Sequence, residues 1–188
     1  MYNLPNLLTM SRIVAIPIIF VTAYFDAVWA NWVAGVVFII AAITDYFDGY
    51  YARKLNIVSS FGRFLDPIAD KLLVATSLLI LVANEDVTIY GLIPVSIILC
   101  RELLVSGLRE FLAQVNINVP VTRLAKWKTG VQMTAIPMLL LGKEVFYYFT
   151  PVGEVLLWIA AILTFMTGYS YLRAGFVHMS NEDKKNQA

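Results

Sequence analysis

The stretch that decides the fold runs from Trp32 to Arg53 and reads WVAGVVFIIAAITDYFDGYYAR. Its first part, Trp32–Thr44, is apolar and carries no charged side chain, whereas Asp45 and Asp48 follow directly after it. An apolar run of this kind is typical of a helix in a lipid bilayer. Ionisable groups at the edge of such a span are costly and are candidates for a functional role. The stretch therefore predicts a membrane helix that ends in functional carboxylates.

The composition of the whole chain also indicates a membrane protein. Of its 188 residues, 60% are hydrophobic and only 14% are charged, and the mean hydropathy is +0.73. Soluble domains are about 45–50% apolar and about 25% charged. A soluble domain of this size would have too small a core for so many apolar side chains. The composition excludes an ordinary soluble globule, and the low charge content excludes a disordered chain.

Apolar stretches of about the length needed for a span follow one another along the chain. They are Ile13–Tyr24, Trp32–Thr44, Leu72–Ala83, Ile89–Leu108, Thr129–Leu141 and Val155–Tyr171. We expect an all-α integral membrane protein with six transmembrane helices. Residues 1–12 mix polar and apolar side chains and are expected to form an interfacial amphipathic helix. Because no internal repeat is visible, residues 1–188 are expected to form one membrane domain, which ends in a polar cytoplasmic tail over 179–188.

Lysine and arginine are distributed unevenly between the connections. Alternate connections are basic, whereas the opposite set contributes only Lys143. The positive-inside rule then predicts a multi-pass protein of the cell membrane with both termini and the basic connections in the cytoplasm. The net charge of +1 does not support a nucleic-acid-binding surface. Cys100 is the one cysteine, so no disulfide can form within the chain.

Aspartates gather at or just inside the expected membrane boundary; they are Asp45, Asp48, Asp66 and Asp70. Spacings of three and four residues place each pair on one helical face, and the segment Lys54–Phe61 can fold the two helices back as an antiparallel pair. Like charges at close range need protonation or a bridging cation, and hard oxygen ligands suit Mg²⁺ or Mn²⁺. In the alternative interpretation the carboxylates are solvated helix ends that pair with Arg53, Arg63 and Lys71.

A known family shows the same pattern. The spacing Asp45-x2-Asp48-Gly49-x2-Ala52-Arg53-x8-Gly62-x3-Asp66-x3-Asp70 resembles the signature of the CDP-alcohol phosphatidyltransferases, with every position matched. The stretches Asn3–Arg12, Arg101–Glu110 and Lys126–Met133 are similar to the phosphatidylglycerophosphate synthase branch of that family. The resemblance implies transfer of the phosphatidyl group from CDP-diacylglycerol to sn-glycerol 3-phosphate, which gives phosphatidylglycerophosphate and CMP in phospholipid biosynthesis.

The resemblance also implies a role for each residue of the signature. Asp45, Asp48 and Asp66 are implied as ligands of Mg²⁺ or Mn²⁺. Asp70 completes the ligand set and is implied as the base that takes the proton from the attacking hydroxyl. Small residues leave room for the cytidine and the diphosphate, and a cation offsets the negative charge; these positions are Gly49, Ala52, Gly62 and Arg53.

An anionic acceptor such as glycerol 3-phosphate needs a cationic pocket separate from the metal. The candidates are Arg101, Arg109, Arg123 and Lys126, with Thr9 and Arg12 reaching the same cavity from the first helix. Both Arg and Lys suit a phosphate monoester, and Glu102 beside Arg101 indicates a buried network. Anchoring by the positive-inside rule explains Arg123, Lys126 and Lys128 equally well, so both interpretations stay open.

Other functions fit parts of the sequence. One is a sister enzyme of the family with inositol phosphate or a neutral alcohol as acceptor. Another is a small cation transporter, although transporters place their sites near the midplane and between repeats, whereas these carboxylates lie at one end of two spans. Membrane lipids are expected partners. A homodimer is compatible with the sequence, but Gly168 and Gly175 do not form a GxxxG pair that would indicate its face.

Overall fold

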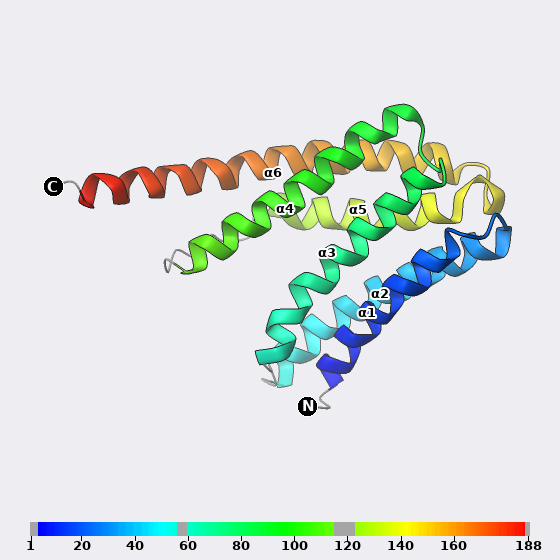
Figure 1. The fold of residues 1–188 in the computed structure, drawn as a ribbon, viewed down its shortest axis with the longest axis horizontal. Helices are drawn as coiled ribbons and strands as arrows, with labels where there is room; N and C mark the ends of the chain where they lie inside the picture. Colours follow the sequence, from blue (N-terminus) through cyan, green and yellow to red (C-terminus); the bar gives the residue numbers. More distant parts are fainter. Residues whose placement is uncertain (1–3, 56–59, 115–122, 187–188) are drawn as a thin grey trace. The chain divides into compact units, whose positions relative to one another are not determined.

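The apolar stretches of the sequence lie in helices, except that the first stretch runs two residues past the end of its helix. The computed structural model describes residues 4–55, 60–114 and 123–186, and within these ranges all regular secondary structure is helical (Figure 1). The elements are α1 (Leu4–Thr22), α2 (Val28–Leu55), α3 (Ser60–Ala83), the 3₁₀-helix η1 (Ile89–Gly91), α4 (Leu92–Gln114), α5 (Arg123–Val145) and α6 (Phe149–Asn186). The prediction of an all-α fold is confirmed.

Several helices are long and apolar enough to cross a bilayer. Among the described residues these are Val28–Asp45, Ile89–Gln114 and Phe149–Arg173, and Leu7–Thr22 is a shorter apolar helix. Large apolar side chains on them are exposed, for example Leu103 at 71% and Phe165 at 67%, as expected for helices that face lipid rather than water. The chain is therefore an all-α membrane protein, and the number of six spans remains a prediction, because charged residues shorten the apolar runs of α3 and α5.

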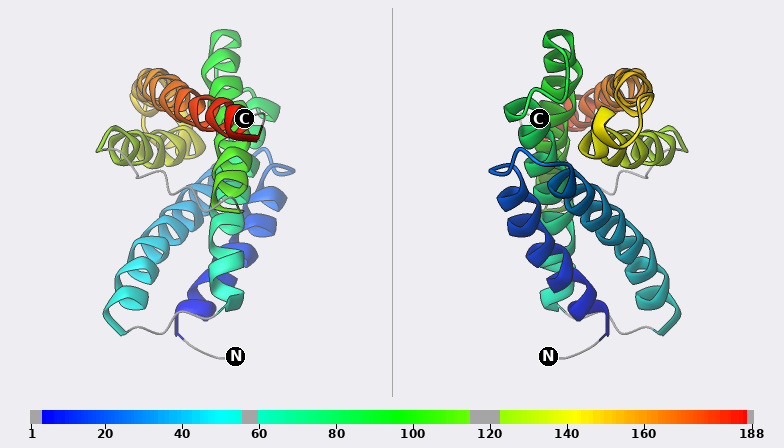
Figure 2. Two further views of the ribbon diagram at one scale, coloured as in Figure 1. Left: turned by 90° about the vertical axis from the view of Figure 1, so that its left-hand side faces the viewer. Right: turned by 90° about the vertical axis from the view of Figure 1, so that its right-hand side faces the viewer.

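The chain forms two compact units. The first unit contains α1, α2, α3 and the segment Met133–Val155, and the second contains Tyr90–Gln132 and the part of α6 from Leu156 onward. In the first unit α1 packs along both α2 and α3 (Figure 2). The core of this unit is apolar, with Ile19, Phe38 and Leu73 all buried.

Glycine permits close helix packing and one sharp change of direction. A Cβ at Gly35 of α2 would lie 2.5 Å from Cγ of Leu141, so only glycine lets this leucine approach so closely. Gly142 has a φ of +66° inside α5. Residues other than glycine adopt this backbone conformation only at an energetic cost. This break directly follows Leu141, where the sequence ends the apolar stretch Thr129–Leu141.

Helix boundaries differ from the prediction at both ends of the chain. We expected an interfacial helix over residues 1–12 and a separate first span, but α1 is one helix from Leu4 to Thr22, since neither proline nor glycine stands between Pro5 and Pro17. At the other end, α6 continues to Asn186 through most of the polar tail, since neither proline nor glycine interrupts residues 176–186.

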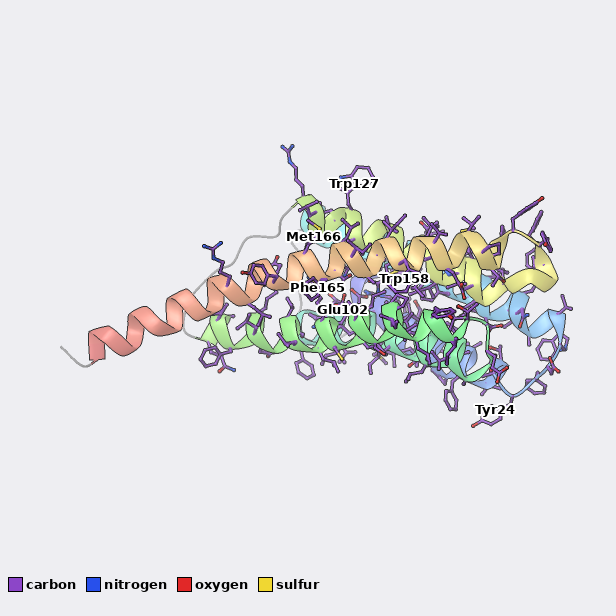
Figure 3. The ribbon with its side chains drawn as sticks, turned by 90° about the horizontal axis from the view of Figure 1, so that it is seen from above. Tyr24, Glu102, Trp127, Trp158, Phe165 and Met166 are labelled. Carbon is purple, nitrogen blue, oxygen red and sulfur yellow. The ribbon has the colours of Figure 1, made fainter. Side chains whose placement is uncertain are left out.

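Aromatic side chains near helix ends point outward. Trp127 of α5 is 71% exposed, and Tyr24, in the turn after α1, is 76% exposed; Figure 3 shows each side chain projecting away from its segment. Tryptophan and tyrosine favour the membrane–water interface. Both positions are consistent with the expected ends of the spans.

Candidate active site

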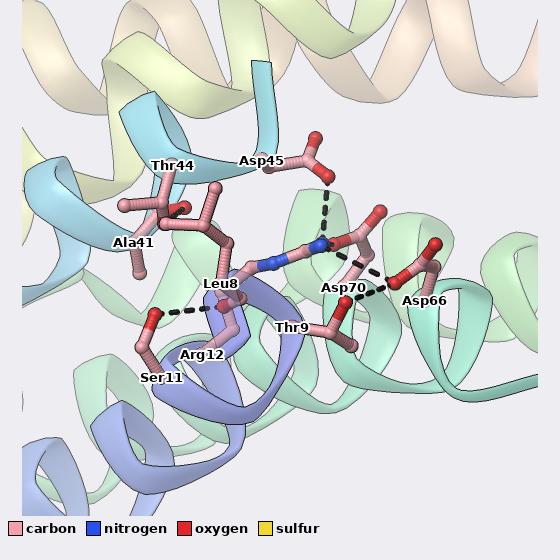
Figure 4. A network of polar contacts seen from close by, with 9 residues as sticks. All are labelled: Leu8, Thr9, Ser11, Arg12, Ala41, Thr44, Asp45, Asp66 and Asp70. Carbon is pink, nitrogen blue, oxygen red and sulfur yellow. Dashed lines mark hydrogen bonds and ion pairs between the residues drawn. The ribbon is translucent and has the colours of Figure 1, made fainter. Parts of the chain in front are cut away.

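Carboxylates from two helices converge on one arginine of a third. Nη1 of Arg12 lies 2.6 Å from Oδ1 of Asp45 and also donates to Oδ1 of Asp70, while Nη2 lies 3.6 Å from Oδ1 of Asp66 (Figure 4). Asp45 stands near the end of the apolar run of α2, and Asp66 and Asp70 stand one turn apart near the start of α3. The predicted meeting of these carboxylates is found for all three.

The first helix supplies the polar partners of the carboxylates. Thr9 stands one turn before Arg12 on α1, and its hydroxyl donates to Oδ1 of Asp66. Both residues are buried, Thr9 at 2% and Arg12 at 1% exposure. The sequence assigned Thr9 and Arg12 to an acceptor pocket, whereas the structure places both against the aspartates. A charged side chain inside an apolar helix must find an opposite charge, and this rule is the signal that could have identified the partners of Arg12.

The carboxylates themselves remain accessible. The side chains of Asp45, Asp66 and Asp70 are 40%, 45% and 38% exposed, although the arginine that they share is covered. The formal charge of these four residues is −3 + 1 = −2. The cluster therefore has surplus negative charge and accessible oxygens, as a cation-binding site requires.

The remaining residues of the signature lie on the same two helices. Gly62 is buried near the start of α3. Asp48, Gly49, Ala52 and Arg53 belong to α2, but their side chains lie outside the described part of the structure. The prediction that Asp48 joins the other three carboxylates therefore falls on a side chain outside the described residues.

The donor set matches a hard divalent cation in its chemistry. Carboxylate oxygens are the preferred protein ligands of Mg²⁺ and Mn²⁺. One oxygen of each of three aspartates lies within ion-pair distance of the same guanidinium group. Among the described residues, no group of three or more Asp, Glu, His or Cys side chains has the geometry to hold a metal ion as it stands. A bound ion would therefore need the aspartate side chains to rotate, or Asp48 to contribute.

A second polar network lies in the other unit. Glu102 of α4 accepts a hydrogen bond from Nζ of Lys128 on α5, and its Oε1 lies 3.3 Å from Nη1 of Arg101. Nη2 of Arg101 lies 3.4 Å from the hydroxyl oxygen of Thr167 on α6. The side chains of Lys128, Arg101 and Glu102 are only 6%, 14% and 19% exposed. The buried network indicated by Glu102 beside Arg101 is thus present.

The unit that holds this second network also contains buried polar atoms that are not satisfied, one of them on Arg101 itself. Within the described part of the chain, Nε of Arg101, Oε1 of Gln132 and Oγ1 of Thr164 are buried and have no hydrogen-bond partner. Buried polar atoms are nearly always paired, so those that are not require an explanation such as a bound molecule. Sequence reasoning missed Gln132, Thr164 and Thr167, because threonine and glutamine in a membrane helix are not distinctive by themselves.

The other predicted acceptor residues are not part of this network. Arg109, Arg123 and Lys126 are all exposed. Exposure of this kind agrees with anchoring at the interface, and it leaves each side chain accessible to a soluble anion. The structure therefore divides the predicted basic residues into a pair that is largely covered, Arg101 and Lys128, and an exposed group.

Comparisons with known proteins agree with the signature. A family model described as CDP-alcohol phosphatidyltransferase matches residues 2–166. A protein of Rickettsia bellii is 53% identical over 92% of this chain and 94% of its own length. Proteins of Bacillus subtilis and Cereibacter sphaeroides are 41% and 38% identical over 91% and 96% of this chain, and over 94% and 99% of their own lengths. All three bear the name CDP-diacylglycerol--glycerol-3-phosphate 3-phosphatidyltransferase.

Proposed function

Because the chain belongs to the CDP-alcohol phosphatidyltransferase family, we propose that it transfers the phosphatidyl group of CDP-diacylglycerol to sn-glycerol 3-phosphate. The products are phosphatidylglycerophosphate and CMP. The observation that carries the proposal is the convergence of Asp45, Asp66 and Asp70, three residues of the family signature, on one point. The relatives named for this reaction, which match over nearly their whole length, support the choice of acceptor.

The diphosphate of CDP-diacylglycerol must be neutralised before an anionic acceptor can approach phosphorus. We assign Asp45, Asp48, Asp66 and Asp70 as the ligands of Mg²⁺ or Mn²⁺. When bound, the metal stabilises the negative charge on the phosphoryl oxygens and on the departing phosphate of CMP. The donor chemistry and the exposure of three of these carboxylates support this assignment.

Asp70 acts as the general base in this proposal. Its carboxylate takes the proton from the attacking hydroxyl of glycerol 3-phosphate, because a neutral hydroxyl is a poor nucleophile. The hydroxyl oxygen then bonds to the phosphorus that carries diacylglycerol, and the bond from that phosphorus to the CMP oxygen breaks. Asp70 is 38% exposed although it pairs with Arg12, so it can accept a proton from a bound molecule.

The nucleotide end of the CDP-lipid is assigned to the small residues of the signature. Gly49, Ala52 and Gly62 leave room for the cytidine and the diphosphate, and Arg53 offsets part of the negative charge. Gly62 is buried near the start of α3.

The phosphate of the acceptor is assigned to the basic residues of the second unit. Arg101 lies in this network, and its buried Nε without a hydrogen-bond partner supports a polar ligand there; Oε1 of Gln132 and Oγ1 of Thr164, in the same unit, are also buried without a partner. Lys128 joins the assignment because it is buried beside Glu102. The remaining basic residues are exposed; they are Arg109, Arg123 and Lys126. We assign them to the long-range electrostatic attraction of the anionic acceptor toward the site.

We further propose that the protein lies in the cell membrane with the active site and both termini on the cytoplasmic side. The long apolar helices support the membrane, and the basic connections support the orientation. The two substrates fit this position, since CDP-diacylglycerol is a lipid and glycerol 3-phosphate is water-soluble.

One assay tests the reaction and the acceptor together. Purified protein in detergent is supplied with Mg²⁺, CDP-diacylglycerol and, in separate reactions, glycerol 3-phosphate, inositol phosphate and a neutral alcohol. We expect CMP release with glycerol 3-phosphate, and loss of that release when EDTA removes the metal. Release with another acceptor alone would assign the chain to a sister activity, and ion flux in liposomes without CDP-lipid would favour a transporter.

A further inference from the structure

The arginine and the aspartates of the carboxylate cluster differ in solvent exposure. The guanidinium-bearing side chain of Arg12 is 1% exposed, whereas the aspartates around it are 38–45% exposed. Arg12 therefore lies beneath the carboxylates, on the side of α1, and the carboxylates face outward from it (Figure 4). A ligand that approaches the cluster from outside would meet the aspartates before it meets the arginine.

The contacts engage one oxygen of each carboxylate. Arg12 reaches Oδ1 of Asp45, Oδ1 of Asp70 and Oδ1 of Asp66. A carboxylate has a second oxygen, and each aspartate can use it for another partner while the first stays bound to the guanidinium. Arginine suits this arrangement because its planar group carries five N–H donors and never loses its charge.

We propose that Arg12 is a positioning residue for the metal site: it holds Asp45 of α2 and Asp66 and Asp70 of α3 together from beneath, so that only a rotation of their side chains is needed for their outer oxygens to bind a divalent cation. The inference rests on the proposed function, in which these aspartates are the metal ligands. Without Arg12 the like charges of three carboxylates would drive α2 and α3 side chains apart.

The arrangement follows a general feature of metal sites. Ligating carboxylates are themselves hydrogen-bonded by neighbouring groups, and removal of such a neighbour typically weakens metal affinity about 10–100-fold. Thr9 supports the same role for α1, since its hydroxyl binds Oδ1 of Asp66 one turn away from Arg12. The first helix thus contributes the support of a site whose ligands belong to the next two helices.

Direct metal binding tests this role without recourse to turnover. Mn²⁺ is titrated into purified protein in detergent, and the free ion is followed by electron paramagnetic resonance. We expect Arg12→Gln to weaken Mn²⁺ binding about 10–100-fold and Arg12→Lys to weaken it less, because lysine keeps the charge but has no planar set of donors. Arg173→Gln is the matched control; it removes an exposed arginine of α6 outside the cluster and should bind Mn²⁺ like the wild type.

Other results would overturn the inference. Tighter Mn²⁺ binding by Arg12→Gln would mean that Arg12 competes with the metal. Unchanged Mn²⁺ binding with a lower Tm in EDTA would mean that Arg12 only stabilises the fold, and unchanged binding with a raised KM for glycerol 3-phosphate would return it to the acceptor pocket. If Arg12→Gln does not fold, Arg12→Lys decides between these outcomes. Failure of the wild type to bind Mn²⁺ would instead overturn the proposed metal site itself.

Discussion

The two polar networks of this membrane protein are built with opposite surplus charge. In the first unit, three carboxylates surround one arginine, which gives −3 + 1 = −2. In the second unit, Arg101 and Lys128 flank Glu102, which gives +2 − 1 = +1. In each network the central residue, Arg12 or Glu102, carries the minority charge. A shared central ion thus holds like charges together, and the sign of the surplus indicates whether a cation or an anion will bind.

The networks also differ in exposure. The surplus charges of the first network, the three aspartates, are 38–45% exposed, whereas those of the second, Lys128 and Arg101, are only 6% and 14% exposed. Buried charges attract a ligand more strongly than exposed ones because the surrounding dielectric constant is low. We therefore expect substitutions in the first network to act on metal and chemistry, and substitutions in the second to act on acceptor affinity alone.

The largest expected effect is that of Asp70→Asn. The amide keeps the size of the side chain but cannot take the proton of the acceptor hydroxyl, so kcat should fall about 10²–10⁴-fold. Binding of the CDP-lipid should remain largely intact. CMP release at saturating Mg²⁺ measures the first quantity, and equilibrium binding of a CDP-lipid measures the second.

Asp26→Asn is the control for Asp70→Asn, since Asp26 is exposed in the turn between α1 and α2. A near-normal rate of Asp70→Asn at saturating Mg²⁺ would remove Asp70 as the base. Loss of CDP-lipid binding by this variant would instead indicate that Asp70 acts mainly as a metal ligand.

A second prediction concerns metal binding. Asp45→Ala removes a proposed ligand and leaves Arg12 with two carboxylates, so metal-dependent binding of CDP should weaken by more than the roughly 10–100-fold typical of an indirect partner. Asp48→Ala should behave alike if both are ligands. Calorimetric titration of CDP with and without Mg²⁺ measures the effect, and metal-dependent binding of normal strength would contradict the assignment.

A third prediction tests the second network. Lys128→Met keeps the length of the buried side chain but removes its charge, and loss of a charge-assisted phosphate contact costs about 1.5–3 kcal/mol. The KM for glycerol 3-phosphate should therefore rise roughly tenfold to a hundredfold, while the KM for CDP-diacylglycerol and the affinity for Mn²⁺ stay unchanged. Initial rates with each substrate varied in turn give both constants.

Exposed arginines provide the comparison for Lys128→Met. Arg109→Ala should raise the KM for glycerol 3-phosphate less than Lys128→Met does, because Arg109 is exposed to solvent. Arg173→Gln, in α6 of the same unit, should leave both constants unchanged. An equal rise of both constants in Lys128→Met would indicate a folding defect, and no change would assign Lys128 to packing or anchoring.

The sequence was sufficient for the features that depend on local pattern. Apolar runs predicted the helices, and the spacing of Asp66 and Asp70 correctly placed both on one face of α3. The segment Lys54–Phe61 was predicted to reverse the chain, and α2 and α3 do end and begin at Leu55 and Ser60. These inferences succeed because helical periodicity relates neighbours within a few residues.

Partners distant in sequence could not be predicted. Arg12 pairs with residues 33 and 58 positions away, and Lys128 pairs with Glu102, 26 positions away. A lone cation on a helix is compatible with anchoring, phosphate binding or an internal ion pair, and only packing decides between them. The sequence assigned Arg12 to the acceptor for this reason, and it left Lys128 between anchoring and phosphate binding.

The smallest expected effect is that of Gly168→Ala, which displaces an ion of the second network without removing it. A Cβ at Gly168 of α6 would lie 3.0 Å from Cγ of Arg101, so the arginine must move by a few tenths of an ångström. Its described polar contacts, at 3.3 Å to Glu102 and 3.4 Å to Thr167, are long enough to permit that shift. Because a misplacement of about 1 Å costs about 10²-fold, the KM for glycerol 3-phosphate should rise by less than about tenfold, with Mn²⁺ affinity unchanged. A change in the Mn²⁺ affinity of Gly168→Ala would contradict the distinction between the two networks. If the KM for glycerol 3-phosphate is unchanged both in Gly168→Ala and in Arg101→Met, Arg101 is not part of the acceptor site.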